Sequence, residues 1–253
     1  MISLLADPSL THSSVSPLAA DLYLRVRERE GRLYTDDIAS HLPDFPSDHP
    51  LKSEWLARAS SARRLLKYLR RLPRSLDVLD VGCGNGWLSH LVAGVEGTRV
   101  WGLDRPGPEI LQAARLWAGP SAVFLTADIA VAPLPRGSFD LIILASVIQY
   151  FPDLAVLVSQ LLRLLRPDGE IHVLDSPLYS AAELDAARRR TEGYYSALGF
   201  PEMAASYFHH TAAGLAGFAV DYLYRPQAVR ARVSRAAGKV ASPFPWLRIR
   251  KVP

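Results

Sequence analysis

The chain has 253 residues, a length that corresponds to one large domain or to a core with appendages. Hydrophobic residues make up 49% and charged residues 21%, which excludes a largely disordered, fibrous or low-complexity protein. The net charge of +4 is unevenly placed, because residues 225–253 hold eight Lys and Arg and no Asp or Glu, which leaves −4 for residues 1–224. This distribution does not support a nucleic-acid-binding surface over the whole domain.

Cysteine and histidine usage argues against disulfides and metals. Cys83 is the only cysteine, and the seven histidines are scattered without the spacing of a zinc site. The first ten residues lack a basic region followed by an apolar run, and no window approaches the ~18 uninterrupted apolar residues of a spanning helix. We therefore expect a soluble, unprocessed protein of the reducing cytoplasm, with no metal and no membrane span.

Residues 1–75 are predicted to form a helical N-terminal cap. Proline-containing turns at 42–46 and 49–50 interrupt it. Residues 54–72 then place apolar side chains at three- and four-residue steps, with arginines and a lysine between them, which is typical of an amphipathic helix packed on a sheet.

From Leu76 the pattern changes to short apolar runs separated by longer, helix-like stretches. Strands that alternate with helices predict a parallel sheet covered on both faces, with ligands beyond the carboxyl ends of the strands. The five predicted strands are Leu76–Val81, Arg99–Asp104, Ala122–Thr126, Phe139–Ala145 and Glu170–Asp175.

The first predicted strand leads into a glycine turn, Leu79-Asp80-Val81-Gly82-Cys83-Gly84-Asn85-Gly86. Glycine lets the backbone turn sharply and approach a ligand closely. A dinucleotide-binding GxGxxG motif requires a third glycine at position 87, where this chain has Trp87. The GxGxG spacing therefore disfavours a nicotinamide-dependent oxidoreductase.

This turn resembles the first motif of class I S-adenosylmethionine-dependent methyltransferases. Four further features agree in order: Leu103-Asp104 ends the second strand, Ala127-Asp128-Ile129 follows the third, residues 139–146 form the fourth and end at Ser146, and residues 165–169 form the turn before the fifth. The family turn commonly reads Pro-Gly-Gly, so Asp168 is a mild departure. The resemblance covers roughly residues 76–175 and implies a Rossmann-like, doubly wound α/β fold with a mostly parallel seven-stranded sheet.

The resemblance also assigns roles to residues. Asp104 is expected to accept hydrogen bonds from both ribose hydroxyls, since a carboxylate has two oxygens and no competing donor. Asp80 is expected near the ammonium end of the cofactor, Asp128 at the adenine amino group and the Ile129 amide at a ring nitrogen. Asp80 or Asp128 as a turn former or helix cap stays an alternative. The expected cofactor-binding residues are Asp80, Gly82, Gly84, Asn85, Gly86, Asp104, Asp128, Ile129 and Ser146.

Acceptor recognition is expected outside the core motif. Residues 180–210 are predicted to form an inserted lid, because an insertion of about thirty residues is more often functional than structural. A final helix is expected at residues 211–218, and the sixth and seventh strands at 218–224 and 246–250. The acceptor-side candidates are Tyr150, Tyr179, Tyr194, Tyr195, Tyr207, His209 and His210.

Tyr150, His209 and His210 are the candidate catalytic residues, the histidines as general bases. Packed aromatic residues with no substrate contact, and a metal site at the His-His pair, are the alternatives. From the N-terminal cap, Tyr34 or Arg58 is expected to touch the methionyl carboxylate, against the alternative of a solvated helix face. The wider set of cap candidates is Tyr23, Arg27, Tyr34, His49, Trp55 and Arg58.

The basic segment 225–253 contains a short predicted amphipathic helix, with an apolar stripe beginning at Val229 and a basic stripe beginning at Arg232. A docked helix with a solvated basic face, an anionic acceptor and a membrane surface are its open interpretations.

Together these features predict a helical cap over residues 1–75 and a methyltransferase domain over 76–253, which transfers a methyl group from S-adenosylmethionine to a small molecule. A nicotinamide-dependent oxidoreductase, an RNA methyltransferase and a non-catalytic S-adenosylmethionine-binding protein are the alternatives.

Overall fold

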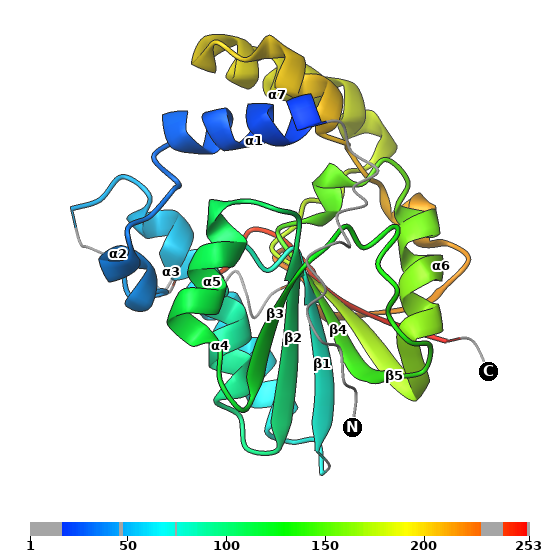
Figure 1. Cartoon of the computed structure of the whole chain (residues 1–253). Coiled ribbons are helices and arrows are strands. Elements are labelled where there is room, and N and C mark those ends of the chain that lie inside the picture. The colour runs from blue at the N-terminus through cyan, green and yellow to red at the C-terminus, as the bar shows by residue number, and fades with distance from the viewer. Residues whose placement is uncertain (1–16, 46–47, 74, 229–239, 252–253) are drawn as a thin grey trace.

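The computed structural model describes residues 17–45, 48–73, 75–228 and 240–251 (Figure 1). A single seven-stranded sheet with the order β3-β2-β1-β4-β5-β7-β6 organises this part of the chain. β7 runs antiparallel to β5 and β6, and the pairs among β1 to β5 are parallel. The expected Rossmann-like, mostly parallel sheet is confirmed. Its strands are β1 (Leu76–Val81), β2 (Thr98–Asp104), β3 (Ala122–Thr126), β4 (Phe139–Ala145), β5 (Leu165–Leu174), β6 (Ala219–Tyr224) and β7 (Trp246–Arg250).

Alternating side chains of the buried strands face opposite layers of helices. Val78 of β1 and Ile143 of β4 pack in one core with helices α3 and α4, whereas Leu79 and Ile142 pack in a second core with helix α6. Figure 1 shows α4 and α6 on opposite sides of the sheet. Both faces are therefore covered, as the apolar strands require. The helices are α1 (Pro17–Arg29), α2 (Asp36–Ser40), α3 (Lys52–Leu69), α4 (Trp87–Ala93), α5 (Pro108–Trp117), α6 (Leu154–Leu164) and α7 (Leu184–Leu198).

The predicted helix over residues 54–72 is helix α3, shifted toward the N-terminus. It ends at Leu69, because the residue before Pro73 is sterically disfavoured in the helical region. β5 starts earlier than expected, since Leu165 already pairs with Phe139 across a bulge.

The segment 180–210 lies beside the N-terminal helix (Figure 1). It consists of the 3₁₀ turns η2 (Ala181–Glu183) and η3 (Pro201–Ser206) on either side of α7. Val26 of α1, Tyr195 of α7 and Met203 of η3 form a small apolar core of their own. α1 and this segment therefore pack together away from the main core.

The final helix predicted over residues 211–218 is wrong. The chain forms only a 3₁₀ turn there, η4 (Ala212–Leu215), because Gly214 and Gly217 weaken a longer helix. The helix predicted within the basic segment begins at Val229 and falls largely on residues 229–239, which lie outside the described residues. No helix in the described ranges is long and apolar enough to cross a membrane.

Candidate functional site

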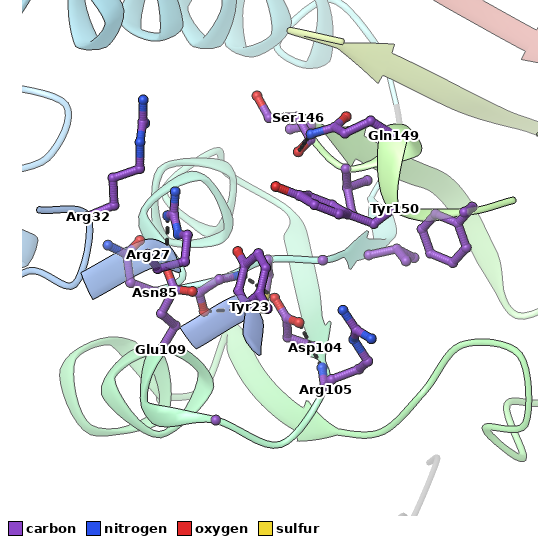
Figure 2. Close-up of a pocket in the computed structure, with 18 of the residues that line it drawn as sticks. Tyr23, Arg27, Arg32, Asn85, Asp104, Arg105, Glu109, Ser146, Gln149 and Tyr150 are labelled. Carbon is purple, nitrogen blue, oxygen red and sulfur yellow. Dashed lines mark hydrogen bonds and ion pairs between the residues drawn. The ribbon is translucent and has the colours of Figure 1, made fainter. Parts of the chain in front are cut away.

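A cavity of about 850 Å³ opens at the carboxyl ends of β1, β2 and β4, and residues of α1 and α7 also line it. This volume lies within the roughly 300–1,000 Å³ typical of small-molecule sites. Every residue of the predicted cofactor set except Gly86 lines it: Asp80, Gly82, Gly84, Asn85, Asp104, Asp128, Ile129 and Ser146. Figure 2 shows Tyr23 and Arg27 of α1 close to Asn85 and Asp104.

The glycine turn requires glycine for two separate reasons. Gly82 has a φ of +71°, a left-handed conformation that other residues adopt at a cost. A Cβ added there would also lie 2.3 Å from Val147 Cγ2, whereas a Cβ at Gly86 would lie 2.8 Å from Ala113. Gly82 thus allows the turn after β1 to pack against Val147, and Gly86 allows α4 to start close to α5.

Asp104, at the end of β2, holds the glycine turn in place. Its Oδ2 accepts a hydrogen bond from the Gly84 amide at 2.7 Å, and its Oδ1 accepts one from the Arg105 amide at 2.7 Å (Figure 2). Burial disfavours the charged form and raises the pKa of Asp104 to about 6. Each oxygen keeps a lone pair for a further donor.

Asp80 is the more deeply buried of the two carboxylates, at 1% exposure. It accepts one hydrogen bond in the floor of the cavity, from Ser89 Oγ at 2.6 Å. Burial, with a smaller contribution from the negative charge of Asp104, raises the pKa of Asp80 to about 7. Both carboxylates therefore lie in an environment that a positively charged ligand would relieve.

Two further strand ends complete this part of the wall. After β3, Asp128 Oδ1 accepts a hydrogen bond from the Ala130 amide at 2.9 Å, so the carboxylate also forms a local turn. After β4, Ser146 has a φ of +56°, and its Oγ donates to the Asp175 carbonyl at 3.0 Å. A left-handed serine is uncommon, and such residues cluster at functional sites.

Helix α1 and the segment that follows it contribute charged and aromatic residues to the cavity lining. Arg27 donates to Glu109 Oε1 of α5 at 3.2 Å and lies 5.8 Å from the ring of Tyr23. Arg32 makes a bidentate pair with Glu54 at 2.6 and 2.7 Å. Of the six candidates from the cap, five line the cavity, whereas His49 packs against Phe45 with ring centroids 4.5 Å apart.

Tyrosines form the part of the wall nearest to α7. Tyr150 makes edge-to-face contacts with Tyr23 at 5.5 Å and with Tyr207 at 6.1 Å. Burial raises the pKa of Tyr150, so its phenol stays protonated at neutral pH. The lining tyrosines are Tyr23, Tyr34, Tyr150, Tyr179, Tyr194, Tyr195 and Tyr207, seven of the chain's ten.

The two candidate histidines lie apart from this cavity. Neither is among its lining residues, and both line a smaller neighbouring hollow. His210 Nε2 contacts the Ile148 carbonyl at 3.0 Å, and His209 Nε2 contacts Thr191 Oγ1 at 2.9 Å. This geometry gives both histidines a role in anchoring residues 180–210 and does not support the expectation that they act as general bases.

Several lining residues have no counterpart in the sequence analysis: Glu30, Arg32, Glu54, Glu109, Gln149 and Arg190. Gln149 adjoins Tyr150, so its position beyond β4 was a usable signal. Glu109 meets Arg27 across 82 positions of the chain, and no local pattern predicts such a pair. In the described part of the chain, no group of three or more His, Cys, Asp or Glu side chains is arranged to hold a metal.

Comparison with known proteins agrees with this site. A methyltransferase-domain family matches residues 79–173. The chain is 34% identical over 108 residues to 2-methyl-6-phytyl-1,4-hydroquinone methyltransferase of Synechocystis, covering 42% of this chain and 34% of that protein. It is 39% identical over 117 residues to nocamycin O-methyltransferase of Saccharothrix syringae, covering 44% and 41%. The chain thus spans well under half the length of these two relatives.

A longer match joins the chain to a protein of Mycolicibacterium smegmatis named "Probable S-adenosylmethionine-dependent methyltransferase", 32% identical over 183 residues, with 67% and 66% of the two chains covered. Among solved structures, magnesium protoporphyrin IX methyltransferase of Synechocystis, with bound S-adenosylhomocysteine, superposes with a TM-score of 0.57 at 17% identity, over 92% and 96% of the two chains. YcgJ of Bacillus subtilis superposes with a TM-score of 0.55 at 16% identity, over 76% and 99%.

The fold and the glycine turn define a Rossmann-like methyltransferase with its ligand site at the carboxyl edge of the sheet. The chain belongs to the class I S-adenosylmethionine-dependent methyltransferases, whose cofactor is S-adenosylmethionine.

Proposed function

We propose that this protein transfers a methyl group from S-adenosylmethionine to a small-molecule acceptor. One observation carries the proposal: the glycine turn with its Asp104 carboxylate and the tyrosine wall line one continuous cavity. The names of the Synechocystis and Saccharothrix relatives refer to a hydroquinone and to nocamycin, and both support a small-molecule acceptor.

The residues present fit the cofactor. Asp104 and Asp80 would supply carboxylates for the ribose hydroxyls and the ammonium group, and the Gly82 backbone lines the cavity beside them. Gly84 and Asn85 would contact the methionyl part, and Gly86 would allow that turn. Asp128, Ile129 and Ser146 would complete the adenine and methionyl contacts, and Arg58 or Tyr34 would meet the carboxylate. The basis for these roles is the resemblance of the glycine turn and strand ends to the methyltransferase family, together with the place of these residues in the cavity lining.

When bound, S-adenosylmethionine supplies a methyl group on a sulfonium, which is open to in-line displacement. The chain's own contribution is to align the acceptor with that methyl group and to exclude water, which in model systems provides up to ~7–11 kcal/mol. Tyr150 lines the cavity with a phenol that is protonated at neutral pH, so it can donate a hydrogen bond that orients the acceptor. We therefore assign Tyr150 a positioning contact with substrate.

We further propose that residues 180–210 and α1 act together as the lid of this cavity. Tyr194 of α7 donates to Glu30 Oε1 at 2.6 Å, and Arg25 lies 5.1 Å from the ring of Phe200, so the two segments are joined by polar and aromatic contacts. The division into a helical cap over 1–75 and a methyltransferase domain over 76–253 stays a prediction, and helix α3 of the cap packs in the same core as β1 and β4.

An RNA acceptor has less support. Two arginines near the tyrosine wall are paired with glutamates, Arg32 with Glu54 and Arg27 with Glu109, which leaves Arg190 of α7 as a single cation there among the described residues. A surface built for phosphates instead presents unpaired cations.

The experiment is a transfer assay with S-adenosylmethionine labelled on its methyl group. The acceptors are separate pools of small metabolites, RNA and protein, and Asp104→Ala is the control. We expect label in the small-metabolite pool with the wild-type protein and none with Asp104→Ala. Label only in RNA or protein, or none in any pool, would overturn the proposal.

A further inference from the structure

The tyrosine wall is continuous and uncharged. Tyr150 touches Tyr23 and Tyr207 edge to face, and Tyr207 in turn lies 6.2 Å from Tyr195. Burial raises the pKa of all four phenols, so at neutral pH they are neutral donors. Such a wall complements the face or edge of another aromatic ring, because ring pairs prefer offset or edge-to-face contact.

Four of the formal charges beside the wall are already paired, whereas Arg190 of α7 lines the cavity without an ion pair among the described residues. Glu30 accepts from Tyr194 and lies 3.2 Å from Arg32 Nε, and Glu109 accepts from Arg27. The Arg27 guanidinium also lies over the ring of Tyr23. A cationic acceptor would therefore meet neither a spare carboxylate among these residues nor a free ring face at Tyr23. An uncharged acceptor avoids the cost of disrupting these pairs.

Within the described ranges, only two buried side-chain polar atoms have no hydrogen-bond partner, Arg27 Nε and Gln149 Oε1, and both residues line this cavity (Figure 2). Gln149 is 8% exposed, and its Nε2 donates to the Ser146 carbonyl at 2.7 Å. That bond fixes the amide orientation, since a flip would set Oε1 against a carbonyl oxygen. Its backbone carbonyl accepts from Phe208 at 2.7 Å, which fixes its position as well.

An acceptor atom buried without a partner costs about 1–3 kcal/mol, and a ligand that brings a donor recovers this. Gln149 lies between Ser146, in the proposed cofactor part of the cavity, and Tyr150 in the tyrosine wall. Its oxygen is therefore placed to meet the end of a ring that packs against the wall. Because Gln149 Oε1 is buried, such a hydrogen bond would be stronger than in solvent.

We propose, resting on the methyl transfer proposed above, that the acceptor is an uncharged phenol whose ring packs on the tyrosine wall and whose hydroxyl donates to Gln149 Oε1. Gln149 is then the residue that selects an O–H group over its alkylated form. If the methyl group goes to this oxygen, the sulfonium S–CH3 bond breaks as the O–CH3 bond forms, the thioether S-adenosylhomocysteine is left, and the phenolic proton passes to solvent, since an amide does not take it up. The methylated product no longer carries the donor, so the same contact would favour its release.

The test measures binding by calorimetry to protein saturated with S-adenosylhomocysteine, so that no turnover is needed. Four probes share one skeleton: 4-ethylphenol, its methyl ether 4-ethylanisole, the saturated 4-ethylcyclohexanol and the anionic 4-ethylbenzoate. The variants are Gln149→Met, which keeps the side-chain volume, and Gln160→Met on α6, which lies outside the cavity lining and serves as the matched control.

We expect wild type and Gln160→Met to bind 4-ethylphenol about tenfold or more tighter than 4-ethylanisole, a ratio that corresponds to one hydrogen bond. Both proteins should also prefer 4-ethylphenol to 4-ethylcyclohexanol, which lacks the aromatic ring, and to 4-ethylbenzoate, which carries a negative charge. In Gln149→Met the phenol-to-anisole ratio should fall to about two or less, with unchanged affinity for S-adenosylhomocysteine. Equal binding of phenol and anisole by the wild type, or no binding of either, overturns the proposal without any variant. Loss of S-adenosylhomocysteine affinity in Gln149→Met overturns it too, since Gln149 would then face the cofactor. Failure of wild type to bind S-adenosylhomocysteine at all refutes the methyltransferase proposal instead.

Discussion

The buried carboxylates of the proposed cofactor site predict a specific pH dependence of cofactor binding. The pKa of Asp80 is raised to about 7 and that of Asp104 to about 6, in both cases mainly by burial. Because folding raises both values above the ordinary 3.8, these groups favour the folded chain at low pH and lose that contribution as the pH rises through 6 to 7. A cofactor that bears an ammonium and a sulfonium should favour the ionised forms and so bind tighter at high pH.

The size of the effect follows from the two values. If both carboxylates must be ionised, about 90% of the protein is competent at pH 8 and about 5% at pH 6, from pKa values of about 7 and about 6. The Kd for S-adenosylmethionine should therefore rise about 20-fold between pH 8 and pH 6, or about 1.8 kcal/mol. Binding at pH 7 should also release about half a proton, which calorimetry in buffers of different ionisation enthalpy detects.

Asp80→Asn is the control for this prediction. Only Asp104 then titrates, so the change in Kd between pH 8 and pH 6 should shrink to about twofold. The cofactor's own amino group titrates equally in both proteins and cancels in the comparison. A wild-type Kd that is flat between pH 6 and pH 8, or one that changes equally in Asp80→Asn, would refute the assigned role of these carboxylates.

Three further predictions concern other parts of the molecule. Gly82→Ala should abolish cofactor binding and lower the free energy of unfolding in urea by about 2–4 kcal/mol, because a left-handed alanine is strained and its Cβ would lie 2.3 Å from Val147. Gly137→Ala is the control, since Gly137 has a φ of +63° and a Cβ there would meet no atom within 4 Å, so only the strain should appear. Equal losses of stability in the two variants would contradict this. Burial raises the pKa of Glu170, but hydrogen bonds from His172 and Tyr68 outweigh it and lower the pKa to about 2. Glu170→Gln should therefore lower the free energy of unfolding by about 1–3 kcal/mol at pH 7, and the difference between the variant and the wild type should narrow as the pH falls from 4.5 toward 2. A difference in unfolding free energy that persists at pH 2 would argue against this role. His209→Ala should keep kcat/KM within about threefold once an acceptor is known, whereas a loss of ~100-fold or more with an altered pH profile would restore a general-base role.

The fold was largely predictable because its strands carry strong local signals. β1, β3, β4 and β7 have the predicted bounds, since each is an apolar run bounded by turn residues. The predicted final helix failed because Gly214 and Gly217 outweighed a weak apolar pattern. The glycine turn was predictable for a different reason. Gly82, Gly84 and Gly86 all have positive φ values, which favour glycine, so the three closely spaced glycines mark the turn in the sequence.

The acceptor side of the site was only partly predictable. Tyr150 and Tyr179 follow strand ends, so the topology alone places them near the cavity. His210 was predicted to be a general base, but its Nε2 atom is hydrogen-bonded to the Ile148 carbonyl. The pair of Arg27 with Glu109 and the unpartnered oxygen of Gln149 depend on how α1 and residues 180–210 pack, and no short-range pattern encodes that.

Calorimetric titration with S-adenosylmethionine tests the central claim most directly, with NADH as competitor ligand and Asp104→Ala as control. The site predicts micromolar binding by the wild type and no binding of NADH. It also predicts loss of binding in Asp104→Ala, because Asp104 holds the glycine turn and is the residue we propose for the ribose. Folded wild-type protein that fails to bind S-adenosylmethionine, or that prefers NADH, would contradict the account.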